Sequence, residues 1–154
     1  MMKLTACIIQ KVIHVALLIM TEVDETHISV RFKHGVHTIY LFVDTLAPVS
    51  EVTAELLRLL RERYPKGLTT SVDPPKTTPV PESTDIAYAV LNVPTDPTRG
   101  WKKLKIGERG EFTPLKAGMK DNGIVAIAFV DSLGDEAIFE VEWPREDEEA
   151  YEDA

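Results

Sequence analysis

The stretch from His27 to Tyr64 constrains the fold of this chain more than any other. It consists of HISVRFK, His34-Gly35, VHTIYLFVD and PVSEVTAELLRLLRERY, which predict a strand, a tight turn, a second strand and a helix. Apolar and polar residues alternate in both strands, which predicts one buried face in each, because successive side chains point to opposite faces. Gly35 suits the turn, since glycine tolerates the positive φ that two-residue hairpin loops need.

The alternation assigns each strand residue to a face. The predicted buried face consists of Ile28, Val30, Phe32, Ile39, Leu41 and Val43. Tyr40 and Phe42 then lie on the opposite face, next to Arg31. Exposed aromatic residues beside an arginine are typical of protein interfaces. We therefore predict a partner-binding surface here; in the alternative, the added strands or the amino-terminal stretch cover these aromatic residues.

The helix follows the hairpin after a short link. Its apolar positions recur at helical spacing and form one stripe, which predicts packing on the sheet; they are Val49, Val52, Leu56, Leu59 and Leu60. Thr45 or Ser50 can cap the helix, and Pro48 suits its first turn. Pro65 and Gly67 predict its end.

Two blocks of the chain resemble ubiquitin-like domains. In LFVDTLAPVSEVTAELL a strand end is followed after five residues by a helix in the register of that superfamily, and FTPLKAGMKDNGIVAIAFV resembles its final segment. The resemblance covers roughly residues 28–64 and 104–130. It implies an α+β fold, a ubiquitin-like β-grasp in which one main helix crosses a mixed sheet. The chain does not end in Gly-Gly, so conjugation through the carboxyl terminus, as in the modifiers of this superfamily, lacks its required residues.

Three further apolar stretches and one mixed segment predict additional strands. Residues 86–93 read as an added, covered strand and residues 102–107 as the middle strand of a ubiquitin-like sheet. Residues 124–130 are almost wholly apolar, as a central strand should be. Residues 137–143 read as a further strand with Phe139, Val141 and Trp143 on one face. These extra strands and a long insertion depart from the family pattern.

The domain is predicted to span residues 27–143, with a flexible insertion at residues 67–85. That insertion holds Pro74, Pro75, Pro79 and Pro81 among threonines and serines, a composition that favours extended chain over a packed core. It is either a passive loop or a docking segment. Residues 144–154 (PREDEEAYEDA) predict an acidic disordered tail.

Residues 1–26 form an extension whose role the sequence leaves open. Gln10, Lys11 and His14 interrupt its apolar run, which is therefore too short to span a bilayer. A secretory signal or anchor, an amphipathic helix packed on the domain, and a true start at Met20 are the three readings. We favour the last, which makes residues 1–19 dispensable for the fold.

Charge and cysteine content indicate the cellular compartment in which the chain works. The net charge is −8, yet residues 131–154 hold eleven acids and one base, so the rest is near neutral. The single Cys7 excludes an internal disulfide and a cysteine-built zinc site. A reducing compartment, cytoplasmic or nuclear, is therefore expected, with no membrane association.

A basic run beside Trp101 supports a second functional class. Phosphate neutralisation and aromatic stacking are both available there, which suits a nucleic-acid partner; the basic residues are Arg99, Lys102, Lys103, Lys105 and Arg109. The acidic tail would compete with nucleic acid for this run, or shield it until a partner displaces it. In the alternative, the run is a solvated strand face without a binding role.

No pattern of catalytic, metal-binding or cofactor-binding residues is recognisable. His27 and His37 could meet across the hairpin, but a metal site needs more ligands, and Cys7 has no histidine placed to activate it. We therefore expect no enzyme, metal or cofactor. The prediction is a non-catalytic ubiquitin-like protein-interaction module, an adaptor or subunit linked by resemblance to ubiquitin or proteasome components. Its candidate partner-binding residues are Arg31, Tyr40, Phe42, Arg99, Trp101, Lys103 and Lys105.

Overall fold

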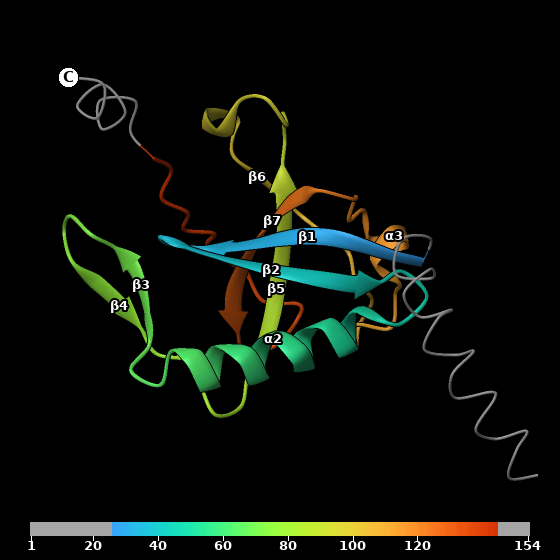
Figure 1. Cartoon of the computed structure of the whole chain (residues 1–154), viewed down its shortest axis with the longest axis horizontal. Helices are drawn as coiled ribbons and strands as arrows, with labels where there is room; N and C mark the ends of the chain where they lie inside the picture. The colour runs from blue at the N-terminus through green and yellow to red at the C-terminus, as the bar shows by residue number, and fades with distance from the viewer. Residues whose placement is uncertain (1–25, 145–154) are drawn as a thin grey trace, which may run out of the picture.

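The computed structural model describes residues 26–144, in which one main helix crosses a five-stranded mixed sheet (Figure 1). The predicted amino-terminal extension and acidic tail lie outside the described residues, in residues 1–25 and 145–154, apart from Thr26 and Pro144. The strands of the sheet are β1 (His27–His34), β2 (His37–Asp44), β5 (Asp85–Leu91), β6 (Trp101–Lys103) and β7 (Gly123–Val130). The other elements are α2 (Val49–Arg63), the two-stranded hairpin of β3 (Leu68–Ser71) and β4 (Lys76–Thr78), a 3₁₀ turn (Pro97–Arg99) and α3 (Pro114–Ala117).

The sheet has the order β2-β1-β7-β5-β6. Strands β1 and β7 run parallel, and the other neighbouring pairs are antiparallel. The prediction that residues 124–130 form a central strand is confirmed. The covered strand predicted at residues 86–93 is confirmed as β5. Its assignment as an addition to the sheet, with residues 102–107 as the middle strand, is wrong, because β5 lies inside the sheet and the short β6 forms its edge.

The hairpin of β1 and β2 follows the predicted pattern. Its turn consists of Gly35 and Val36, one position later than predicted, because His34 pairs with His37. Gly35 has a φ of +54°. Val30 and Phe32 are fully buried, whereas Tyr40 and Phe42 are 68% and 70% exposed. The faces assigned from the alternation are therefore confirmed.

Helix α2 packs its apolar stripe on the buried face of the hairpin. Five of its side chains are buried, namely Val49, Val52, Leu56, Leu57 and Leu60, while Leu59 is half-buried. Neither Thr45 nor Ser50 caps the helix, which corrects the prediction; Pro48 is the N-cap. Instead, the amides of Val49 and Ser50 donate to the carbonyls of Phe112 and Gly110, at 2.8 and 2.9 Å. The loop before α3 thus supplies the acceptors that the helix start requires.

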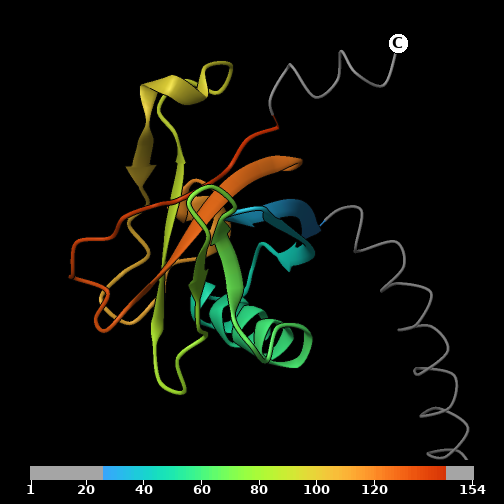
Figure 2. The ribbon, with the colours of Figure 1, turned by 90° about the vertical axis from the view of Figure 1, so that its left-hand side faces the viewer.

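The prediction that residues 67–85 pack no core is wrong. Strands β3 and β4 form a hairpin there, beyond the carboxyl end of α2 (Figures 1 and 2). Leu68 is fully buried, and Thr70 is 2% exposed. The hairpin is tied to the main sheet, since the amide of Val36 donates to the carbonyl of Thr69 and the amide of Thr69 donates to Nε2 of His37. The buried side chains of Leu68 and Thr70 thus anchor a segment whose composition is typical of a loop.

Residues 131–144 cross the face of the sheet that α2 leaves uncovered (Figure 2). Four alanines on that face are buried, namely Ala87, Ala89, Ala126 and Ala128. We call residues 131–144 the C-terminal strap. The predicted strand at residues 137–143 is wrong, because only an isolated bridge between Gly35 and Val141 forms. Two backbone hydrogen bonds hold the strap to the hairpin turn. The amide of Gly35 donates to the carbonyl of Glu140 at 2.7 Å, and the amide of Glu142 donates to the carbonyl of Gly35 at 2.9 Å.

Candidate interaction surface

The most exposed aromatic residues of the described chain lie on β2. Tyr40 pairs with Arg31 of β1, and Phe42 pairs with Ser29, so all four side chains share one face. Arg31 is half-buried, and its Nη2 donates to the carbonyl of Asn122 at 2.9 Å. The arginine is therefore held beside the tyrosine by a third segment of the chain. We call Arg31, Tyr40 and Phe42 the aromatic face.

The basic run of the sequence is dispersed by the fold. Arg99 forms an ion pair with Asp96 at 3.4 Å. Nζ of Lys103 donates to the carbonyls of Leu133 and Asp135, at 3.0 and 2.8 Å, so its hydrogen bonds are used to hold the strap. Lys105 remains exposed. Of these three basic residues, Arg99 and Lys103 make contacts within the chain, and Lys105 stays available to a phosphate backbone.

The ring of Trp101 contacts a second aromatic ring, which the sequence does not predict. Its ring stacks on Trp143, with centroids 6.1 Å apart and an interplanar angle of 11°. Nζ of Lys33 lies 5.2 Å from the centroid of the Trp143 ring. Trp143 thus contacts both Lys33 on β1 and Trp101 on β6. The sequence signal was available, since these are its two tryptophans, but nothing in their spacing indicates contact.

A groove of about 650 Å³ lies between the start of the strap and the chain that follows β6. Its walls include Leu104, Ile106, Phe112 and Leu133. Beside it, Tyr88 is fully buried, and burial raises the pKa of its hydroxyl, which is 2.7 Å from Oγ1 of Thr53. The groove walls are mainly apolar.

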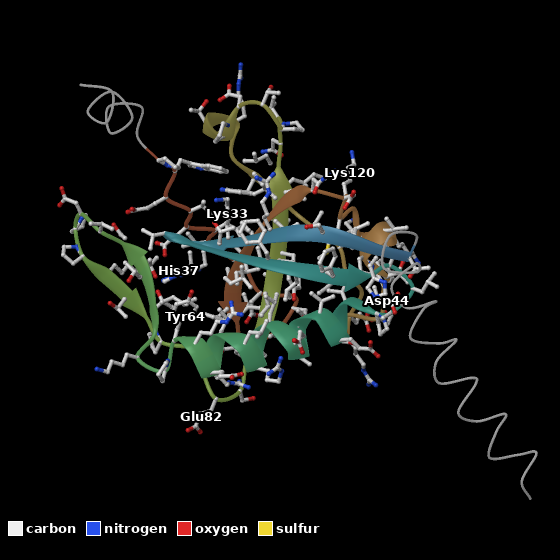
Figure 3. The ribbon with its side chains drawn as sticks, viewed as in Figure 1. Lys33, His37, Asp44, Tyr64, Glu82 and Lys120 are labelled. Carbon is white, nitrogen blue, oxygen red and sulfur yellow. The ribbon has the colours of Figure 1, made fainter. Side chains whose placement is uncertain are left out.

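The three histidines among residues 26–144 lie apart from one another or contact other groups. The predicted meeting of His27 and His37 across the hairpin is wrong, because His27 pairs with Asp44 and His37 pairs with His34. Figure 3 shows His37 and Asp44 near opposite ends of the hairpin. The His37 ring packs against Tyr64, with centroids 4.5 Å apart. Within residues 26–144, no three histidine, cysteine, aspartate or glutamate side chains are placed to hold a metal ion.

His34 is a buried titratable group that connects three elements. Its Nδ1 lies 3.3 Å from the carbonyl of Ile127, and its Nε2 lies 3.0 Å from Oγ1 of Thr70. A neutral ring satisfies both contacts by donating from Nδ1 and accepting at Nε2. Burial lowers the pKa of His34; the Ile127 carbonyl and Glu140 act in the opposite direction, and Lys76 acts with burial.

The free energy of unfolding is expected to fall as the pH drops through 6.5, the ordinary pKa of histidine. Below that pH the unfolded chain binds a proton that the folded chain, with its lowered pKa, does not yet bind. The pKa of His37 is lowered as well, by burial and then by His34, so it adds to the same slope. Urea unfolding between neutral pH and about pH 5 measures it. His34→Gln should flatten the slope, because it removes the buried imidazole; a slope unchanged in this variant would contradict the assignment.

Comparisons with known proteins show no family for this chain. No protein-family model matches it, and no curated protein matches its sequence. One solved structure similar to it is a chain of the "MycP5-free ESX-5 inner membrane complex, State II", at 15% identity and a TM-score of 0.45. The match covers 83% of this chain and 26% of that chain, so this chain spans about a quarter of its length. Among the described residues, no helix is both long and apolar enough to cross a membrane.

Proposed function

We propose that this protein is a non-catalytic protein-interaction module of ubiquitin-like β-grasp type, which acts as a subunit or adaptor of an assembly through its aromatic face. The observation that carries the proposal is the pair Tyr40 and Phe42, 68% and 70% exposed on adjacent outward positions of one strand. Aromatic residues and arginine dominate the binding energy of protein interfaces.

The β-grasp assignment is supported by the placement of the two blocks that resemble ubiquitin-like domains. The first block supplies the hairpin and α2, and the second ends in β7, which lies beside β1 and parallel to it. The helix packs Val52 and Leu56 in the same core as Val30 and Ile39. Partners of the ubiquitin or proteasome systems follow from the resemblance alone.

A nucleic-acid partner is the less favoured function. Trp101 already stacks on Trp143, and Lys103 already donates to two carbonyls of the strap. The tryptophan therefore has one ring face already covered, and the lysine has two of its three N–H donors already used, which weakens the case for base stacking and phosphate binding there.

The test is capture of partners from an extract of the native cell with the full chain as bait. We expect a stoichiometric protein partner whose retention falls about thirtyfold or more in the double variant Tyr40→Ser/Phe42→Ser, the effect of losing a hot spot. Ile138→Ser is the matched control, because Ile138 is 81% exposed but lies on the strap. Retention that is equal in both variants, or salt-sensitive RNA or DNA as the main captured species, would contradict the proposal.

A further inference from the structure

Strand β2 forms one edge of the five-stranded sheet, and its outer backbone groups have no partner in the described chain. In an antiparallel pair, hydrogen-bonded and non-hydrogen-bonded residues alternate. His34 and His37 close a two-residue turn and form a bonded pair, so Thr38, Tyr40 and Phe42 direct their N–H and C=O groups away from β1. Within residues 26–144, no backbone or side-chain group bonds to these six atoms.

The two edges of the sheet differ in their protection. Strand β6, the other edge, has three residues, two of which are Lys102 and Lys103. Short length and lysine are the usual devices that keep an edge strand from pairing with another chain. Strand β2 has eight residues, HTIYLFVD, without lysine, arginine, proline or a register shift in its pairing with β1. Its length, straight register and exposed aromatic residues suit an edge that pairs.

We propose that β2 pairs in antiparallel orientation with β2 of a second copy of this chain, with Tyr40 opposite Phe42 of the other copy. This inference rests on the proposed function and names the partner of its aromatic face. The register places Leu41 of both copies on the two-fold axis and forms two identical Tyr40–Phe42 cross-strand pairs. Aromatic cross-strand pairs stabilise sheets, and a two-fold interface must be self-complementary in this way.

Charge complementarity favours this register. Lys33 and Asp44 lie near opposite ends of the hairpin (Figure 3). Antiparallel pairing therefore brings Asp44 of one copy opposite Thr38 of the other. Nζ of Lys33 already reaches Oγ1 of Thr38, at 3.0 Å. Two symmetric Asp44–Lys33 ion pairs then close the ends of the interface.

The register is tested by disulfide trapping in the full chain carrying Cys7→Ser. Leu41→Cys places two cysteines directly opposite each other in a non-hydrogen-bonded pair, about 4.5 Å apart between Cα atoms, which a disulfide can bridge. Tyr40→Cys is the matched control, since it faces Phe42 of the other copy. We expect a covalent dimer from Leu41→Cys and none from Tyr40→Cys. Trapping through Tyr40→Cys alone, or through neither in folded protein, would overturn the register.

A charge exchange tests the same register without a covalent bond. Asp44→Lys and Lys33→Asp should each weaken the dimer about tenfold in sedimentation equilibrium, and the double variant should restore it. Asp44→Lys also removes the hydrogen bond from the amide of Leu46 to Oδ1 of Asp44, but the single and double variants share this loss. Rescue therefore reports the ion pair. A chain that stays monomeric at every concentration, or two single variants without rescue, would overturn the inference.

The two proposals fail in different ways. A monomer that still captures a different protein through Tyr40 and Phe42 would overturn the dimer and leave the interaction function in place. Capture that does not depend on Tyr40 and Phe42, with the Leu41→Cys dimer formed, would contradict the proposed function alone.

Discussion

Phe32→Ala is expected to lower the free energy of unfolding by about 3–5 kcal/mol, the usual cost of deleting a buried phenyl ring. Phe32 is fully buried, and its ring meets Tyr88 edge-on, with centroids 5.9 Å apart. It lies between Ile39 of β2 and Val125 of β7, so its loss leaves a cavity where two strand pairs join. Urea unfolding of dilute protein measures the change.

The matched control is Phe42→Ala on the neighbouring strand. Phe42 is 70% exposed, and the same substitution there should change the free energy of unfolding by no more than about 0.5 kcal/mol. Dilute protein is needed because any self-association through β2 would add a concentration-dependent term. An equal decrease in the free energy of unfolding in the two variants would show that the faces of the hairpin are assigned wrongly. It would also contradict the packing of α2 on this sheet.

Gly35→Ala is expected to destabilise the chain by about 3 kcal/mol or more, since it combines backbone strain with overpacking. Gly35 has a φ of +54°, which side chains rarely adopt. A Cβ there would lie 2.6 Å from Cα of Thr70 and 2.8 Å from its carbonyl oxygen, and closer still to the carbonyl oxygen of Thr69. The added methyl group would push β3 away from the hairpin.

Gly35 also holds the strap through two backbone hydrogen bonds, so the same substitution should loosen residues 140–142. Hydrogen exchange at the amide of Glu142 would detect this, together with the shift in the thermal midpoint. Gly134→Ala is the control, because a Cβ at Gly134 meets nothing within 4 Å. Similar stability of both variants would contradict the close approach of β3 to the turn.

The hairpin, α2 and β7 could be predicted because their information is local. Alternation in β1 and β2, the stripe from Val49 to Leu60 and the apolar run of β7 each match one periodicity. The exposure of Tyr40 and Phe42 follows directly from the same alternation. Their outward orientation is thus confirmed, while their role in binding stays a prediction.

The errors arise where contacts between distant segments decide the structure. Residues 137–143 alternate like a strand, yet Val141 reaches the sheet only at the end of β1, beside Gly35, where a single bridge forms. In the opposite sense, the threonines of β3 and β4 look like a linker, but Leu68 and Thr70 are buried by contacts that no local pattern encodes. The helix start shows the same limit, since its acceptors come from residues 110 and 112.

The buried alanines on the sheet face that the strap crosses determine where this protein can be truncated. The sheet ends at Val130, and a domain boundary placed there would look reasonable from strand positions alone. Such a fragment would uncover Ala87, Ala89, Ala126 and Ala128, which are at most 6% exposed in the intact chain. It would also strip the stacking partner from Trp101. Recombinant versions should therefore extend at least through Trp143. A shorter version would expose a flat apolar surface and is expected to aggregate.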